Sequence, residues 1–414
     1  MAPKKLKMTI CRHSNHSPGF LVRFVLAALL AVPGVHSCAQ GNGEPVVIGK
    51  KIQIHSKVLD ETRTLLIATP AGYDQESERY PVLYLLDGEE NFVQVVGIVQ
   101  SLAEADRIPP ILVVGIANTE RERDLAPHTE VELEIRFHPT SGGASEFLKF
   151  IRSELIPYVD LHYRTRPYKM LVGHSLGGLF AVYALASDPK LFNAYIAIDP
   201  TTLSWNNGSV IAKARTAFKG LKELPSDLYV AATDESRAAL STIQRLGETL
   251  EEARLKGFRW TFKQMPGETH TSIVHQGIYS GLDKIFAGWH LASPLKLYDE
   301  GGLEAIHRHF AEGASRYGYT RKTPAFTVSL VVAALLANDR LEEAASVLLH
   351  DPKTYPPPWN QLDALARAYA QRGDNNQAIR FYKLSLEQNP KNEWAREKLG
   401  EMGVDAQGKK PQQH

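Results

Sequence analysis

The chain has 414 residues, of which 43% are hydrophobic and 22% are charged. This composition is typical of globular proteins and excludes a disordered, collagen-like or coiled-coil description of the whole chain. The 47 basic and 46 acidic side chains leave a net charge of +1, so there is no large cationic footprint for nucleic acid. The two cysteines, Cys11 and Cys38, exclude a disulfide-dense scaffold and a cysteine-rich zinc site.

The first 38 residues have the pattern of an export signal. A basic segment precedes the apolar run 24–32, which is far shorter than the ~20 residues that span a bilayer. Two processing routes stay open: cleavage at the small residues around Cys38, or lipidation of Cys38 in 35–38, which resembles a bacterial lipobox. We therefore expect a signal peptide over 1–38. The mature protein is expected to be periplasmic, lipid-anchored or secreted, with no transmembrane span.

Residues 45–291 alternate between strand-like and helix-like segments. Short apolar runs bounded by turn residues, with helix-length segments between them, indicate a parallel sheet covered on both faces. The expected helices are 144–158, 176–187 and 237–256. The expected strands, of which the first two are edge strands, are 46–55, 64–69, 81–86, 111–117, 170–172, 194–198, 228–232 and 258–264. This pattern predicts one α/β domain.

Residues 292–404 contain no strand candidate and are expected to be helical. The segment 359–392 fits a 34-residue tetratricopeptide register, with small Ala366 and Ala378 between the helices and Tyr382 filling the seam. A more divergent repeat is expected at 325–358, and a generic pair of helical hairpins is the alternative. Such a tail either binds a protein segment or braces the first domain. Residues 405–414 are expected to form a flexible tail.

The sequence Gly173-His174-Ser175-Leu176-Gly177-Gly178 follows an apolar strand and precedes an apolar helix. This is the strand–turn–helix setting of a nucleophile elbow, in which a strained serine projects its Oγ from the edge of the sheet. Ser175 is therefore the expected nucleophile. Leu176 begins the helix, and its N–H lies at the helix N-terminus, where the helix dipole favours a developing oxyanion.

In this architecture an acid and then a histidine follow the serine along the chain. His270 lies in a loop after the last strand and is preferred to His275, because a base must be free to reach the serine. The acid is expected at Glu235, after the preceding strand, with Asp234 as the alternative. Asp199 is a third candidate, and its place before a proline is more typical of a turn residue. The second oxyanion donor is expected to be the N–H of Glu89, in the loop 85–91.

Together these residues resemble an esterase family of α/β-hydrolases that includes esterase D-like proteins, siderophore esterases, feruloyl esterases, S-formylglutathione hydrolases and mycolyltransferases. The matching segments are LLDGE at 85–89, RERDLAP at 121–127, GHSLGG at 173–178, IDPTTLSWN at 198–206 and GETHTS at 267–272. The resemblance implies an α/β-hydrolase fold followed by a helical-repeat domain. It also implies that Arg123, Asp124 and Trp205 line or order the mouth of the substrate site.

These expectations combine into an exported serine esterase. Ser175, His270 and a carboxylate would act through an acyl-enzyme, with no metal or organic cofactor. By the resemblance alone, the substrate would be a siderophore or another bulky ester. Two alternatives remain: an acyltransferase with the same triad, and a non-catalytic binding protein in which the repeats serve as an adaptor.

Overall fold

A computed structural model describes residues 44–404 of the chain. The signal peptide expected over 1–38, with Cys38, and the final residues 405–414 lie outside the described residues. All the elements described below belong to the unit that begins at residue 48. Within the described part, no helix is both long enough and apolar enough to cross a membrane.

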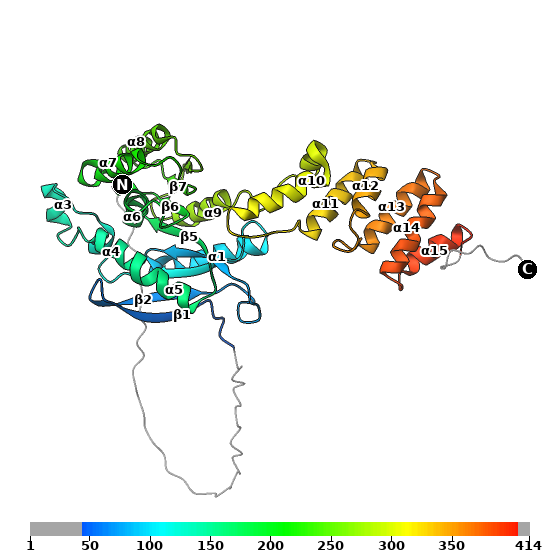
Figure 1. The fold of residues 1–414 in the computed structure, drawn as a ribbon, viewed down its shortest axis with the longest axis horizontal. Coiled ribbons are helices and arrows are strands. Elements are labelled where there is room, and N and C mark those ends of the chain that lie inside the picture. The colour runs from blue at the N-terminus through cyan, green and yellow to red at the C-terminus, as the bar shows by residue number, and fades with distance from the viewer. Residues whose placement is uncertain (1–43, 405–414) are drawn as a thin grey trace, which may run out of the picture. The chain divides into compact units, whose positions relative to one another are not determined.

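The unit is built on an eight-stranded sheet with the order β1-β2-β4-β3-β5-β6-β7-β8. The first two strands pair antiparallel with their neighbours, and all the others are parallel. Figure 1 shows β1 and β2 at one edge of the sheet. The strands are β1 (Lys50–Ser56), β2 (Glu61–Ala68), β3 (Tyr80–Leu85), β4 (Leu112–Ile116), β5 (Thr165–His174), β6 (Ala194–Ile198), β7 (Asp227–Ala232) and β8 (Arg259–Gln264). The α/β-hydrolase fold expected from the sequence is confirmed.

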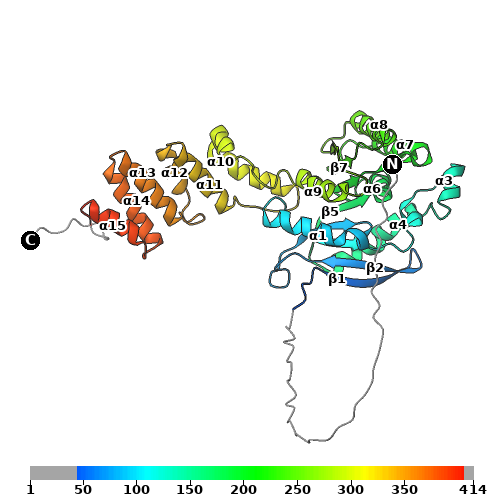
Figure 2. The same ribbon diagram turned by 180° about the vertical axis from the view of Figure 1, so that it is seen from behind.

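Helices cover both faces of the sheet, as its continuous apolar strands require. Figure 2 looks onto the face covered by α1 (Gly88–Glu104) and α9 (Ile273–Ile285), whose apolar side chains form one buried cluster with the strands. The opposite face carries α4 (Ala144–Phe150), α5 (Ile156–His162), α6 (Leu176–Ser187), α7 (Trp205–Lys219) and α8 (Arg237–Ala253). The helix expected at 144–158 is interrupted by a π-helical turn at Ile151–Leu155.

The tail is helical from α10 (Pro294–Ser315), which is kinked at Gly301 and Gly302, to the end of the described residues. Its other helices are α11 (Ala325–Ala337), α12 (Leu341–Leu348), α13 (Trp359–Gln371), α14 (Asn375–Gln388) and α15 (Glu393–Glu401). They share an apolar core that includes Ala366, Ala378 and Tyr382. Two helix pairs thus occupy the two expected repeats.

The segment that ends α10 packs with the sheet domain rather than with the tail core. Ala314 and Tyr317 are buried in the same apolar cluster as α1 and α9. The Tyr317 hydroxyl donates a hydrogen bond to the carbonyl of Ile285 at 2.7 Å, and Arg316 pairs with buried Asp227 at 3.0 Å. Contacts of the first domain therefore extend well past residue 291, where the sequence places its end.

Candidate active site

Ser175 occupies the turn between β5 and α6 in a strained backbone conformation, with φ of 56° and ψ of −117°. Gly173 makes this turn possible, because a Cβ at its position would lie 2.2 Å from the carbonyl oxygen of Gly177. The Ser175 N–H donates to the carbonyl of Ile198 at 2.9 Å, which ties the turn to β6. The sequence motif thus forms the sharp elbow that it predicts.

His270 lies in the loop between β8 and α9 and reaches the elbow. Its Nε2 is 3.0 Å from Ser175 Oγ, so the hydroxyl can donate its proton to the ring. Its Nδ1 is 2.5 Å from Asp199 Oδ2, and because a carboxylate only accepts, this nitrogen carries the ring proton. The imidazole thereby bridges serine and carboxylate in the order found in catalytic triads.

The carboxylate on the imidazole is Asp199, so the expectation of Glu235 or Asp234 at this position is wrong. Asp199 directly follows β6, and its side chain is 2% exposed. Thr233 holds the other oxygen, Oδ1, through a main-chain N–H at 3.0 Å. Glu235 instead accepts a hydrogen bond from the main-chain N–H of His270 at 2.9 Å, and Asp234 is exposed.

The sequence did carry a signal for Asp199. In open α/β sheets, ligand-binding and reactive side chains gather at the carboxyl ends of the strands. Ser175, Asp199 and His270 follow β5, β6 and β8, and the first two strands are direct neighbours. Chain order favours a carboxylate after β7 and leaves Asp199 as the third candidate, whereas this spatial rule favours the end of β6.

The two expected oxyanion donors lie at the starts of helices beside neighbouring strands. Leu176 is the first residue of α6, and Glu89 is the second residue of α1, which begins within the segment expected to be a loop. The first N–H groups of a helix have no partner in the preceding turn. The strands β3 and β5, which lead into the two helices, pair in parallel up to Leu85 and Val172. The role of the Leu176 and Glu89 N–H groups as oxyanion donors stays a prediction.

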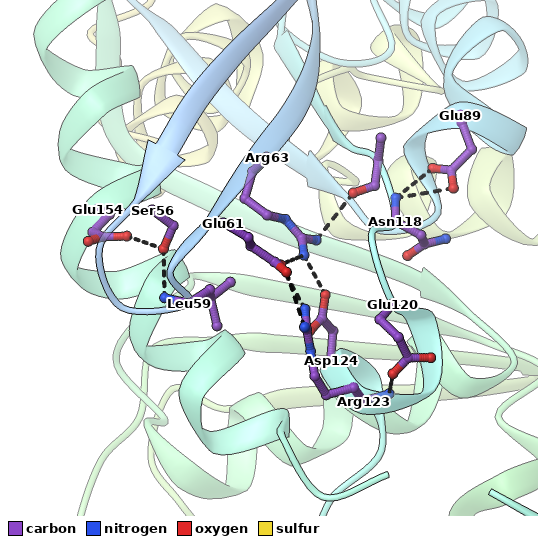
Figure 3. Close-up of polar contacts among 11 residues, drawn as sticks. Ser56, Leu59, Glu61, Arg63, Glu89, Asn118, Glu120, Arg123, Asp124 and Glu154 are labelled. Atoms are coloured by element: carbon purple, nitrogen blue, oxygen red, sulfur yellow. Dashed lines mark hydrogen bonds and ion pairs between the residues drawn. The ribbon is translucent and has the colours of Figure 1, made fainter. Parts of the chain in front are cut away.

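A buried carboxylate fixes the start of α1. Asp87, in the left-handed conformation with φ of 52°, accepts hydrogen bonds from Arg121 Nε at 2.7 Å and from Asn118 Nδ2 at 2.8 Å. The hydrogen bond to Asp87 raises the pKa of Arg121. The Glu89 carboxylate accepts from the Asn118 N–H at 3.0 Å (Figure 3). The partners in each of these hydrogen bonds are more than 25 positions apart, and no sequence pattern connects them.

Arg123 and Asp124 belong to a buried ionic network. Arg63, from β2, is fully buried and lies 2.6 Å from Asp124 and 2.7 Å from Glu61. Arg123 also contacts Glu61, at 2.7 Å. Figure 3 shows these four side chains together. Asp124 is 1% exposed, so it cannot line a substrate pocket. The network orders α2 (Arg121–Leu125), which carries Arg121 to Asp87.

Trp205 is likewise a buried anchor. Its side chain is 5% exposed, and its Nε1 donates to the carbonyl of Pro127 at 2.9 Å. It thereby ties the start of α7 to the segment that follows α2. Lining of the substrate mouth by Trp205 and Arg123 stays a prediction, whereas their ordering of nearby segments is observed.

Comparisons with known proteins identify the family of this chain. The family described as "Putative esterase" matches residues 56–249, and a tetratricopeptide repeat matches 359–402. The chain is 30% identical over 227 residues to the ferri-bacillibactin esterase BesA of Bacillus subtilis, covering 50% of this chain and 76% of that protein. The chain belongs to this esterase family. It is a carboxylic ester hydrolase with a tetratricopeptide-like tail.

Two further similarities support the assignment. Over 82 residues the esterase is 43% identical to the siderophore enterobactin esterase of Emericella nidulans, covering 19% of this chain and 27% of that protein. It also resembles the crystal structure of an IroE-like serine hydrolase from Shewanella oneidensis, with a TM-score of 0.56 and 26% identity. That similarity covers 82% of this chain and 99% of the other, so it reaches beyond the sheet domain.

Proposed function

We propose that this esterase hydrolyses siderophore esters through an acyl-enzyme on Ser175. The observation that carries the proposal is the continuous hydrogen-bonded series from Ser175 Oγ to His270 Nε2 at 3.0 Å and from His270 Nδ1 to Asp199 Oδ2 at 2.5 Å. Such a series lets an otherwise weak hydroxyl nucleophile lose its proton as it attacks.

In the first half-reaction, Ser175 Oγ attacks the ester carbonyl carbon while His270 Nε2 takes the hydroxyl proton. Asp199 keeps the imidazole in the required tautomer and stabilises the positive charge that forms on it. The N–H groups of Leu176 and Glu89 are the proposed donors to the oxyanion. His270 then protonates the leaving alcohol as the tetrahedral intermediate collapses to the acyl-enzyme.

In the second half-reaction, water attacks the acyl-enzyme and repeats these steps. His270 takes a proton from the water, and the released Ser175 Oγ recovers its proton from the imidazolium. Every proton transfer uses groups of the protein. In an acyltransferase, an alcohol would replace water at this step, and the same three residues would serve.

The substrate class is proposed from the relatives, whose names specify ferri-bacillibactin and enterobactin as esters that they cleave. The test is a panel of ferric and iron-free catecholate siderophores, S-formylglutathione, feruloyl esters and short nitrophenyl esters. The proposal expects the highest kcat/KM for a siderophore. A preference for another class would contradict the substrate, and acyl transfer to an added alcohol at the expense of hydrolysis would favour the transferase.

Export is a separate proposal that rests on the basic and apolar pattern of residues 1–38 and on Cys38. Cell fractionation and the intact mass of the mature protein test it. A processed chain that carries lipid on Cys38 would support anchoring. A processed chain without lipid would remove only the anchor, and an unprocessed cytosolic chain would contradict export.

A further inference from the structure

The loop that carries His270 has little packing of its own. Of residues 265–272, only Met265 is buried, and the others are half-buried or exposed. Exposed loops are normally the more mobile parts of a protein, yet a general base must remain within hydrogen-bond reach of its partner. Interactions from outside the loop must therefore restrain the main chain of His270.

One such interaction comes from the loop after β7. The main-chain N–H of His270 donates to Glu235 Oε2 at 2.9 Å. Glu235 itself is exposed, and the Nδ1 of the imidazole ring is bonded to Asp199 instead. The Glu235 carboxylate, which follows the neighbouring strand β7, thus holds the main chain of His270 and not its ring.

A second interaction comes from the residue immediately before the serine. His174 Nε2 lies 2.7 Å from the carbonyl oxygen of His270, and the two ring centroids are 4.6 Å apart. Because a carbonyl only accepts, His174 Nε2 carries a proton. The bond therefore links the strand of the nucleophile directly to the loop of the base.

The charge state of His174 suits this position. Burial lowers the pKa of His174, and the charge of the nearby His270 ring lowers it further, whereas the hydrogen bond to the His270 carbonyl and the carboxylates of Asp87 and Asp199 act in the opposite direction. A neutral His174 can donate through Nε2 without placing a second positive charge beside the imidazolium that forms on His270. Two like charges at this separation would disfavour that imidazolium.

We propose that His174 and Glu235 are positioning residues that hold the main chain of His270 from both sides, one at its carbonyl and one at its N–H. This main-chain clamp rests on the proposed roles of Ser175 and His270. It also gives Glu235 a function different from that of a triad acid. The two roles make opposite predictions for an amide side chain, which can accept a hydrogen bond but carries no charge.

Glu235 offers the cleaner test, because it is exposed and its replacement should not disturb folding. Glu235→Gln can still accept from the His270 N–H, and we expect kcat within about 2-fold of wild type. Glu235→Ala removes the acceptor and should lower kcat by roughly 10-fold with little change in KM, as expected for a displaced catalytic group. If Glu235→Gln loses activity as severely as Asp199→Asn, the residue acts as an acid and the clamp is overturned.

A second pair of variants, His174→Gln and His174→Leu, tests the hydrogen bond at the carbonyl of His270. The amide nitrogen of His174→Gln can occupy the place of Nε2 and should keep most of the activity. His174→Leu should lower kcat by roughly 10- to 100-fold at similar KM. A thermal melt of each variant separates this loss from misfolding. In proton NMR, the downfield signal of the His270 Nδ1–H should broaden in His174→Leu and remain sharp in His174→Gln.

Wild-type kcat in both Glu235→Ala and folded His174→Leu would overturn the clamp. Labelling by a fluorophosphonate probe keeps this result distinct from failure of the proposed function. Wild-type protein that is not labelled at Ser175 would refute the serine mechanism itself. Labelled wild type with fully active clamp variants would refute only the clamp.

Discussion

Ser175 and His270 lie within hydrogen-bond distance, yet the fold holds them in different ways. The serine stands on an elbow in which main-chain atoms of Gly173 and Gly177 are so close that no side chain fits between them. The histidine stands on an exposed loop that depends on side chains from three other strand ends, namely His174, Asp199 and Glu235. The elbow is fixed by local sterics, whereas the loop is fixed by contacts that form only in the folded chain.

The largest effect should follow from removing the nucleophile. Ser175→Ala deletes the group that forms the acyl-enzyme, and we expect kcat to fall by about 10⁴- to 10⁶-fold. The variant should melt like wild type, because the hydroxyl makes no contact that the fold needs. Steady-state kinetics on a nitrophenyl ester with a parallel thermal melt would check this. A variant that retained most of its activity would place the chemistry elsewhere.

Asp199→Asn tests the side-chain contacts of the loop. The amide keeps the shape of the carboxylate, but it no longer selects the Nδ1–H tautomer or stabilises the imidazolium. We expect kcat to fall by about 10³- to 10⁴-fold. The matched control is Asp234→Asn, the same change on an exposed carboxylate near Glu235, which should be silent. Equal losses in the two variants would remove Asp199 from its proposed role.

This contrast also explains which parts of the site could be predicted from the sequence. GHSLGG lies within six consecutive residues, so its glycines, its strand and its helix could be read together, and α6 begins and ends where the pattern places it. His270 was found because chain order restricts it to the segment after the last strand. Among the candidate acids Asp199 came only third, since Asp199 and His270 are 71 residues apart and the pairing of β6 with its neighbours brings them together.

In the fold, too, local patterns predict the elements, whereas contacts between distant residues leave no signal in the sequence. The apolar run 194–198 gives β6 its observed bounds, because a fully buried strand shows in composition alone. Arg63 gave no comparable signal. An arginine just before the expected edge strand 64–69 normally points to solvent, but here it belongs to β2 and is fully buried between Asp124 and Glu61. Likewise, nothing in the helical pattern expected over 292–404 indicates that Tyr317 belongs to the core of the sheet domain.

Gly173→Ala tests the elbow by itself. A Cβ would lie 2.2 Å from the carbonyl oxygen of Gly177, so the turn must open. A displaced nucleophile should lower kcat by about 10²-fold, and the strain should lower Tm measurably. Gly97→Ala is a suitable control, because its Cβ would meet no atom within 4 Å. An active Gly173→Ala with normal Tm would show that sterics do not fix the elbow.

Truncation of the tail should affect the loop more than the elbow. The loop leads into α9, and the end of α9 is held by Tyr317 through the carbonyl of Ile285. Ending the chain at Ser293 removes Tyr317 and exposes apolar surface, so we expect aggregation or roughly 10-fold lower kcat.

A control truncation that ends after Thr323 keeps the segment with Tyr317 and should preserve activity on a small ester. That result would make α11–α15 dispensable for catalysis and leave them free to bind a partner. Equal activity of both truncations would refute the bracing role of Tyr317.

The smallest expected effect is a pH dependence of stability at His174, which lies between the elbow and the loop. Its pKa is lowered in the folded state by burial and by His270, whereas in the unfolded chain it is about 6.5. Below pH 6.5 the unfolded state therefore binds more protons. The contribution of His174 to stability is fully present above that pH and declines as the pH falls toward the folded-state pKa.

The variant His174→Gln does not titrate at this position. Between pH 7.5 and 5, the Tm of wild type should therefore fall relative to the Tm of His174→Gln. Melting curves at half-unit steps in pH test this, and a constant difference would show that His174 is not held neutral by its surroundings.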